Sequence, residues 1–454
     1  MALKRVDGGE QPYIPAGPFK LRIPLVHFEW QWPEFFQGLI LCATCLGAIP
    51  VLTEYLGVSF EVALTMVIIN GFLYMLHYLL GDPVVPGWIT PAIPLVMAFL
   101  TKYQIGPERT QAMIALQLML AFVFLFLGST GLAFRLVNLI PNSIKAGVIL
   151  GAGIAAIINV MNTRFASAPI VITLGSVIAF YLLFSSSFKA IAKKNRLLWQ
   201  LSKYGMLPSI IFALIVGPFV KELPWPNIQW GFSSLKLGEL INGYTLFGLG
   251  FPKLSLFLDA LPLLIAVYII AFGDFVLAET VIGAAAKERP DEKVEFNPNR
   301  SNLISGIRNL VMSLVAPYTQ LCGPLWAAVT VSVAERYKMG REGMYSIWGG
   351  IGTFRFATFV ALFLMPIVSL VRPSLTVALA LTLVVQGFAC AYIAMEMCKD
   401  NAQRGVAGFM AVILAVKGAA WGLGAGVLFY LVCEYMPKSL TATPSVGNQV
   451  KTDA

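Results

Sequence analysis

The stretch Asp82–Tyr103 (DPVVPGWITPAIPLVMAFLTKY) constrains the fold most, because it is predominantly apolar and yet rich in proline. Each proline removes a backbone donor and clashes with the preceding turn, so the stretch cannot form one continuous helix. The pattern predicts an extended segment followed by a half-helix, with Thr90 as the N-cap and Pro91 in the first turn. The free backbone N–H groups of this half-helix would face the break.

A second stretch of this kind, Ala316–Tyr337 (APYTQLCGPLWAAVTVSVAERY), lies in the other half of the chain, with Gly323 and Pro324 in place of Thr90 and Pro91. A further pair of segments, LIPNSI and VRPSLT, is separated along the chain by nearly the same number of residues as the first pair. Each of these segments opens a long apolar run. These pairs predict two structural repeats. Interrupted apolar segments at corresponding positions of two halves are typical of a transporter's binding site. The alternative is a pair of proline-kinked helices with no ligand between them.

The composition places these segments in a membrane. Of the 454 residues, 58% are hydrophobic and only 12% are charged, and no water-soluble core could bury so much apolar surface. A helical span needs about 20 residues, so the chain has room for roughly fourteen spans. We therefore expect an all-α polytopic membrane protein with short extended breaks in spans 3 and 10.

The net charge of +9 is explained by where the basic residues lie, which argues against a nucleic-acid partner. They cluster in the N-terminal arm and in alternate loops: Lys4, Arg5, Lys20 and Arg22; Lys189, Lys193, Lys194, Arg196 and Lys203; Lys287, Arg289, Lys293 and Arg300; Arg336, Lys338 and Arg341. With an even number of spans, the positive-inside rule puts both termini in the cytoplasm. The expected location is the bacterial cytoplasmic (inner) membrane, with no removable signal peptide in residues 1–34.

The order of polar and apolar segments predicts five parts of the chain. They are a cytoplasmic arm and interfacial segment (1–34), a first seven-span repeat (35–222), an outer connecting loop (223–255), a second seven-span repeat (256–436) and a cytoplasmic tail (437–454).

Ionisable groups at membrane depth cost roughly 2.5–3.5 kcal/mol, so each needs a partner or a function. Asp274 is the deepest acid, and we expect it to carry a proton or to hydrogen-bond the substrate, with Glu279 as a second coupling residue. Arg355 is the deepest base, and three roles are open for it: it could be the charge partner of Asp274, bind an anionic substrate, or extend its charged end to the membrane surface. In the alternative interpretation, Asp274 is a structural acid paired with Arg355 or Lys417.

The two breaks supply the remaining candidate ligands. Half-helix N-termini present free N–H groups and partial positive charge, while Trp88 could stack on a planar ring and neighbouring side chains could donate or accept hydrogen bonds. The expected substrate-binding residues are Trp88, Thr90, Ala92, Asp274, Tyr318, Thr319, Gln320, Cys322 and Gly323. No metal or cofactor is expected, because Cys42 and Cys45 have no second ligand pair, and no nucleophile motif predicts an enzyme.

Several segments resemble the nucleobase–ascorbate transporter family of uracil and xanthine permeases. FQGLILCATCLGAIPVL, INGFLYML and PGWITPAIPLVMAFL resemble its first three spans, LVNLIPNSIKAGVILGAGIA its fifth, and NPNRSNLISGIRNLVMSLVAPYTQLCGP its ninth span and second break. The likeness covers most of the chain. It implies two inverted seven-span repeats, with a core of spans 1–4 and 8–11 and a gate of spans 5–7 and 12–14. Substrate would sit between the breaks, against span 8.

The chain departs from the family at the site. Family members usually carry an acid in span 8 and a histidine one turn later. In this chain Ile270 stands where the acid would be expected, and Asp274 stands nearer the histidine position. No carboxylate occupies the span-10 break. The related sulfate permease family is therefore the alternative. We expect a proton-coupled, elevator-type symporter of a nucleobase, purine derivative or similar planar solute; the alternative is a transporter or exchanger of sulfate, molybdate or an organic anion. The sequence is also compatible with Na⁺ as the coupling ion and with a homodimer.

Overall fold

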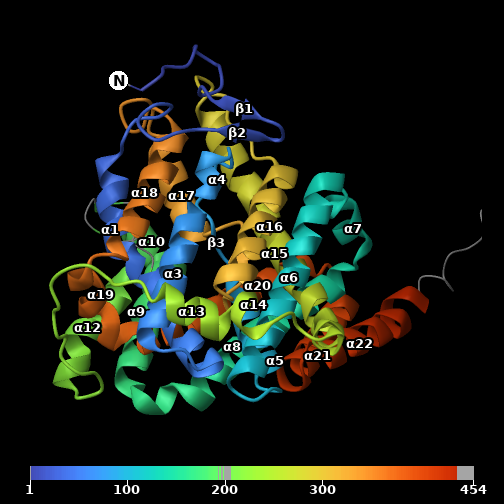
Figure 1. Ribbon diagram of the computed structural model, residues 1–454. Coiled ribbons are helices and arrows are strands. Elements are labelled where there is room, and N and C mark those ends of the chain that lie inside the picture. Colours follow the sequence, from blue (N-terminus) through green and yellow to red (C-terminus); the bar gives the residue numbers. More distant parts are fainter. Residues whose placement is uncertain (1, 193, 196–197, 199–205, 437–454) are drawn as a thin grey trace, which may run out of the picture.

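The computed structural model describes residues 2–192, 194–195, 198 and 206–436, and they are mostly helical (Figure 1). A hairpin of β1 (Ile14–Ala16) and β2 (Phe19–Leu21) lies in the N-terminal arm. The first half then contains α1 (Trp32–Leu46), α2 (Ile49–Val51), η1 (Leu52–Leu56), α3 (Phe60–Tyr74), α4 (Leu76–Leu79), β3 (Gly87–Trp88), η2 (Thr90–Ala92), α5 (Ile93–Leu100), α6 (Pro107–Thr130), α7 (Ala133–Leu139), α8 (Asn142–Thr163), η3 (Phe165–Ser167), α9 (Pro169–Phe184), α10 (Ser186–Ala192) and α12 (Leu207–Phe219). The second half contains α13 (Leu237–Tyr244), α14 (Leu246–Leu249), α15 (Leu254–Glu288), α16 (Pro298–Val315), β4 (Cys322–Gly323), α17 (Ala327–Tyr337), α18 (Ile347–Ala361), α19 (Met365–Val371), η4 (Arg372–Ser374), α20 (Leu375–Met397), α21 (Asn401–Lys417), α22 (Ala419–Tyr430) and η5 (Leu431–Tyr435).

Helices long and apolar enough to cross a membrane recur throughout the described residues. Six segments qualify: Trp32–Leu56, Phe60–Leu79, Pro107–Thr130, Asn142–Ser167, Leu254–Glu288 and Met365–Met397. The pair α9 and α10, bent by 56°, would make a seventh. The predicted polytopic membrane fold is confirmed, whereas the fourteen-span count and the inverted repeats stay predictions. The predicted tail 437–454 and the basic residues Lys193, Arg196 and Lys203 lie outside the described residues.

The two extended breaks cross each other. Strands β3 and β4 pair antiparallel, with Gly87 opposite Gly323 and Trp88 opposite Cys322. Glycine is required at both crossing points: a Cβ on Gly87 would lie 2.6 Å from the carbonyl oxygen of Leu325, and a Cβ on Gly323 would lie 2.8 Å from the backbone of Trp88. The sequence prediction that the interruptions of the two halves meet is confirmed.

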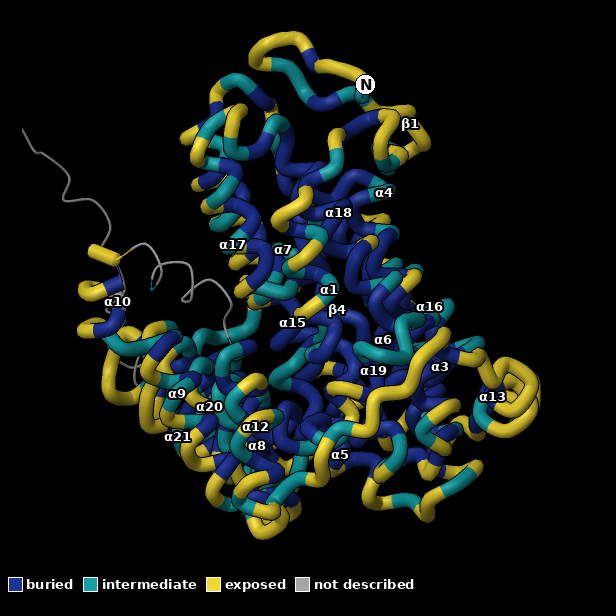
Figure 2. Tube along the Cα trace, turned by 90° about the vertical axis from the view of Figure 1, so that its left-hand side faces the viewer, coloured by how far each residue is buried: buried dark blue, intermediate teal, exposed yellow. Residues whose placement is uncertain are grey.

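The helices pack in two groups around this crossing. In the first group, which we call the core, α1 packs on α18, α6 packs on α16 and α15, and α17 contacts α15 and α18. Helix α3, which contacts α16 and α18, and helix α5, which contacts α15, belong to the same group. In the second group, which we call the gate, α8 packs on α20 and α21, and α9 packs on α12 and α20. Figure 2 shows the core extending toward the N-terminal arm, with the gate helices α8, α9, α20 and α21 beside its other end.

The N-terminal arm is fastened to the core by charged groups. The β1–β2 hairpin donates backbone hydrogen bonds from Lys20 and Arg22 to the end of α4, and the Arg5 side chain forms an ion pair with Asp291. Asp291 also binds Arg289 and Arg341. Hydrogen bonds from Arg289, opposed by partial burial and aided by Arg5, lower the pKa of Asp291 below its ordinary value of 3.8. We call this end of the molecule the arm end.

One predicted span is divided. The sequence predicts a single helix over Tyr345–Val371, but α18 ends at Ala361 and α19 begins at Met365. Pro366, in the first turn of α19, has no N–H to continue the helix. Residues of the connecting loop satisfy the freed backbone groups: Ser233 donates to the carbonyl of Phe363 at 2.8 Å, and Met365 donates to Gly231 at 3.1 Å.

Candidate functional site

A fully buried arginine on α16 holds the crossing together. Arg308 donates to the carbonyl oxygens of Gly323 at 2.8 Å and Gly87 at 3.4 Å, and so binds both extended segments. It also donates to Nε2 of His77 at 3.1 Å. His77 therefore accepts at Nε2 and donates from Nδ1, 2.7 Å from the carboxylate of Asp82. Through neutral His77, the buried carboxylate of Asp82 offsets the charge of Arg308.

The neighbouring residue on α16 fixes strand β4. The Asn309 side chain accepts from the backbone N–H of Cys322 at 3.0 Å and donates to its carbonyl at 2.8 Å. Thr330 does the same for the first break, since its hydroxyl lies 3.1 Å from the Val85 nitrogen. Two side chains of the second half, of which Thr330 reaches across to the first half, thus satisfy backbone groups that the missing helix turns leave free, as burial requires.

A cavity of about 330 Å³ lies where the crossing faces the gate. The core contributes residues of α1, α3 and α15 and of both breaks: Leu41, Thr44, Cys45, Tyr74, Gly87, Trp88, Thr90, Pro91, Asp274, Leu277, Leu325, Trp326, Ala327, Ala328 and Val329. The gate contributes Leu183, Met206, Leu207, Thr382, Val385, Gln386, Ala389, Tyr392 and Ile393. The two half-helices, η2–α5 and α17, both begin at the cavity wall.

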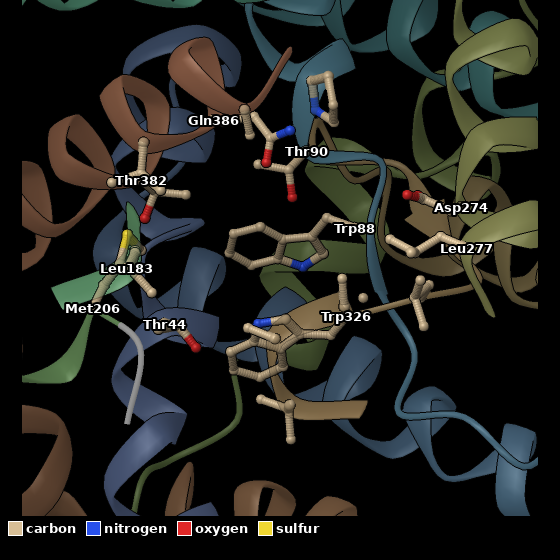
Figure 3. A pocket seen from close by; sticks show the side chains of 18 of the residues that line it. Thr44, Trp88, Thr90, Leu183, Met206, Asp274, Leu277, Trp326, Thr382 and Gln386 are labelled. Carbon is tan, nitrogen blue, oxygen red and sulfur yellow. The ribbon is translucent and has the colours of Figure 1, made fainter. Parts of the chain in front are cut away.

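Two indole rings project into this cavity, one from each break. Figure 3 shows Trp88 in the middle and Trp326 below it, with Asp274 and Leu277 to one side and Thr382 and Leu183 of the gate to the other. The Nε1 atom of Trp88 is buried and has no hydrogen-bond partner among the described residues. The cavity therefore offers two aromatic surfaces and an unused donor.

Apolar packing closes one side of the cavity. Ile93 and Met97 of α5 form a buried cluster with gate residues that include Leu379 and Leu381, and Trp88 packs against it. Figure 1 places α5 at the end of the molecule far from the arm end, so this cluster lies on that side of the crossing. The contact joins core to gate, so it must break if the two groups slide past each other.

Asp274 reaches the cavity from α15 and is only partly exposed. Within the described part of the chain it forms no ion pair and no hydrogen bond. The alternative prediction that it pairs with Arg355 or Lys417 is wrong, since Lys417 is exposed and Arg355 is fully buried among other groups. An unpaired acid at this depth can take up or release a proton without breaking a salt bridge.

Arg355 places a second cation directly behind the wall. Its guanidinium carbon lies 4.1 Å from the ring centre of Tyr74 and 5.1 Å from that of Trp326. None of the three side-chain nitrogens of Arg355 has a hydrogen-bond partner within normal geometry among the described residues. The Cys45 thiol, a weak acceptor, lies beside the guanidinium. Tyr74, Trp326 and Cys45 line the cavity whereas Arg355 does not, so the charge lies one layer behind its surface.

Of the predicted site residues, the structure brings Trp88, Thr90 and Asp274 to the cavity. Ala92 is buried in η2 and does not line it, and Glu279 is exposed elsewhere on α15. The residues predicted from the second break also lie outside the cavity wall and are buried: Tyr318, Thr319, Gln320, Cys322 and Gly323. Their polar groups serve the fold; for example, the Gln320 side chain donates to the carbonyl of Ala48.

The second half-helix begins later than predicted, which accounts for these misplaced residues. Cys322 and Gly323 use their backbone groups for strand pairing, and the Trp326 nitrogen donates to Val85 at 2.6 Å. The helix therefore starts at Ala327 rather than at Pro324. Sequence reasoning missed Trp326, which stands just before its half-helix as Trp88 stands before the first, and this shared placement is the signal that could have identified it.

Comparisons with known proteins bear on the fold. No protein-family model and no curated protein sequence matches the chain. Among solved structures, the transmembrane domain of a cyanobacterium bicarbonate transporter, BicA, matches with a TM-score of 0.53 and 14% identity, over 87% of this chain and 97% of that one. The murine Solute Carrier 26 family member A9 (Slc26a9) anion transporter in the inward-facing state matches with a TM-score of 0.53 and 13% identity, over 90% of this chain and 69% of that one.

These similarities establish the fold. The protein is a polytopic membrane protein with the fold of these two transporters, built around a cavity at two crossing breaks.

Proposed function

We propose that the protein is a secondary transporter of a small anion, which it carries by moving core against gate. The observation that carries this proposal is the charge behind the cavity. Arg308 has Asp82 as a counter-charge through His77, but Arg355 is fully buried with no carboxylate partner in the described residues. A buried charge without a partner is costly, and an anion in the cavity would offset that cost.

The two half-helix N-termini act in the same direction. The free N–H groups at the start of α17 lie at the wall beside Ala327 and Ala328, and the helix dipole adds partial positive charge there. A neutral nucleobase would leave the Arg355 charge uncompensated. The fold neighbours, which are named as bicarbonate and anion transporters, also support an anionic substrate over a nucleobase.

The position of Asp274 in the cavity wall couples anion transport to a proton. An ionised Asp274 in the cavity wall would repel an anion, and protonation of its carboxyl removes that repulsion. The other titratable side chains of the wall are Cys45, Tyr74 and Tyr392, and none of them carries a negative charge in its ordinary neutral form. The anion and one proton would therefore enter together, and the loaded cavity would gain no net charge.

Reconstituted protein tests this function. Proteoliposomes with an alkaline interior should accumulate an anion from a panel of bicarbonate, sulfate and organic carboxylates. Asp274→Asn, which mimics the protonated side chain, should still exchange the anion but should no longer concentrate it; Glu279→Gln, on the exposed part of α15, is the matched control. Uptake of uracil or xanthine with no anion uptake would refute the proposal.

A further inference from the structure

The walls of the cavity are poorly suited to a small inorganic anion. Hydrocarbon side chains cover much of its surface, including Leu41, Leu183, Met206, Leu207, Leu277 and Val385. A compact oxyanion would lose part of its hydration shell against these hydrocarbon side chains, and that loss is expensive. At about 330 Å³ the cavity falls in the size range of sites for small organic ligands.

The two indoles supply what an organic body would need. Trp88 and Trp326 approach the same space from opposite halves of the chain (Figure 3), and large aromatic surfaces favour offset or edge contacts with another ring. Part of the Trp326 surface is already occupied by Phe354, whose ring contacts it edge-on at 5.8 Å, and by Arg355. The surface that lines the cavity is left for a ligand.

Uncharged polar side chains lie on both sides of the cavity, among them Thr44 and Thr90 on the core side and Thr382 and Gln386 on the gate side. The unpartnered Nε1 of Trp88 can donate one hydrogen bond, and the first N–H groups of α17 can donate others. Arg355 supplies one charge that no carboxylate offsets. This arrangement suits a ligand with one anionic head and a flat apolar body, and it gives a second anionic group no counter-charge.

We propose that the transported anion is a flat aromatic monocarboxylate, with its ring against Trp88 and Trp326 and its carboxylate toward Trp88 Nε1 and the start of α17. This inference rests on the proposed function, because it names the substrate class of the same cavity. It adds that the indoles contribute affinity and that the head group carries a single charge.

The test is binding to the purified full chain, measured as ligand-dependent thermal stabilisation and as an equilibrium Kd. Benzoate is the probe. Cyclohexanecarboxylate keeps the charge without the flat ring, benzamide keeps the ring without the charge, and bicarbonate and sulfate are the inorganic comparisons. Benzoate should bind at least about tenfold more tightly than each of the other four.

Variants locate the binding. Trp88→Leu and Trp326→Leu should each weaken benzoate binding about tenfold, and Trp88→Phe and Trp326→Phe should recover most of the loss because they restore an aromatic ring. Trp421→Leu is the matched control, since Trp421 is 71% exposed on α22. A thermal unfolding profile for each variant without ligand shows whether it is folded.

The outcomes separate this inference from the proposed function. If bicarbonate or sulfate binds, depends on Arg355 and outcompetes benzoate, the aromatic class is refuted and the anion transporter stands. If benzoate binds equally well to folded Leu variants of both tryptophans, the assigned position of the ring is refuted. If no anion binds and uracil does, both the inference and the proposed function fail.

Discussion

Replacing Arg355 by methionine should weaken anion binding about thirtyfold while leaving the protein at least as stable. The guanidinium carbon lies 5.1 Å from the Trp326 ring centre. A carboxylate on the cavity side of that ring, near the start of α17, would lie about 3.5 Å beyond it. At a charge separation of 8 to 9 Å and an effective dielectric constant of about 20, the attraction is about 2 kcal/mol, which corresponds to the thirtyfold change in Kd.

Stability should move in the opposite direction to affinity. Methionine removes a buried charge that has no carboxylate partner, so the cost of its desolvation disappears. Arg355→Lys should keep most of the affinity, because the charge remains and no strong hydrogen bond of the guanidinium is lost. Arg372→Met is the matched control: Arg372 also lies over an aromatic ring, that of Phe60 at 3.8 Å, but it is exposed and outside the cavity.

Isothermal titration or competition binding with the transported anion measures these Kd values, and thermal unfolding without ligand measures stability. The reasoning fails if folded Arg355→Met binds within twofold of the unaltered protein. It also fails if Arg355→Lys loses as much affinity as Arg355→Met, since the charge would then not be the cause.

Two further predictions concern the fold. Gly87→Ala should destabilise the protein by about 1–3 kcal/mol, because the new Cβ would lie 2.6 Å from a backbone oxygen; thermal unfolding measures the loss, and Gly405→Ala, with open space around its Cβ, should not reproduce it. Asp291 has a lowered pKa in the folded protein, so its contribution to stability is complete above its unfolded pKa near 3.8 and is lost as the pH falls through the folded value. Acid unfolding followed below pH 4 should therefore become less steep in Asp291→Asn, and an unchanged profile would contradict the role of the arm contacts.

The prolines of residues 83–94 made the first break predictable, because their effect on the backbone is local. The convergence of both breaks also followed from the sequence, since paired interruptions in two halves have few other uses in a membrane. The start of the second half-helix could not be predicted from the sequence. Proline is favoured in a first helical turn, and Pro324 satisfies that preference. Only the pairing of Gly323 with Gly87, a contact between distant parts of the chain, delays the helix to Ala327.

The two arginines show the same limit. The position of Arg308 near the cytoplasmic end of the ninth predicted span predicts a side chain that reaches water, yet it is fully buried against Gly87 and Gly323. Arg355 is fully buried, and its neighbours could not be inferred from the sequence, because Tyr74, Trp326 and Cys45 come from three separate segments. Sequence periodicity describes which residues are apolar, and it does not reveal which polar groups meet inside.

Anomalous scattering from the protein bound to 4-bromobenzoate would test the central claim most directly, because the bromine atom reports where an anion with a flat body rests. The account predicts one dominant bromine peak inside the cavity, between the gate and the two tryptophans that flank the crossing. A dominant bromine peak in the crevice beside Lys102 and Asp259 would contradict the account. So would the absence of a bromine peak in the cavity when the protein binds the compound in solution.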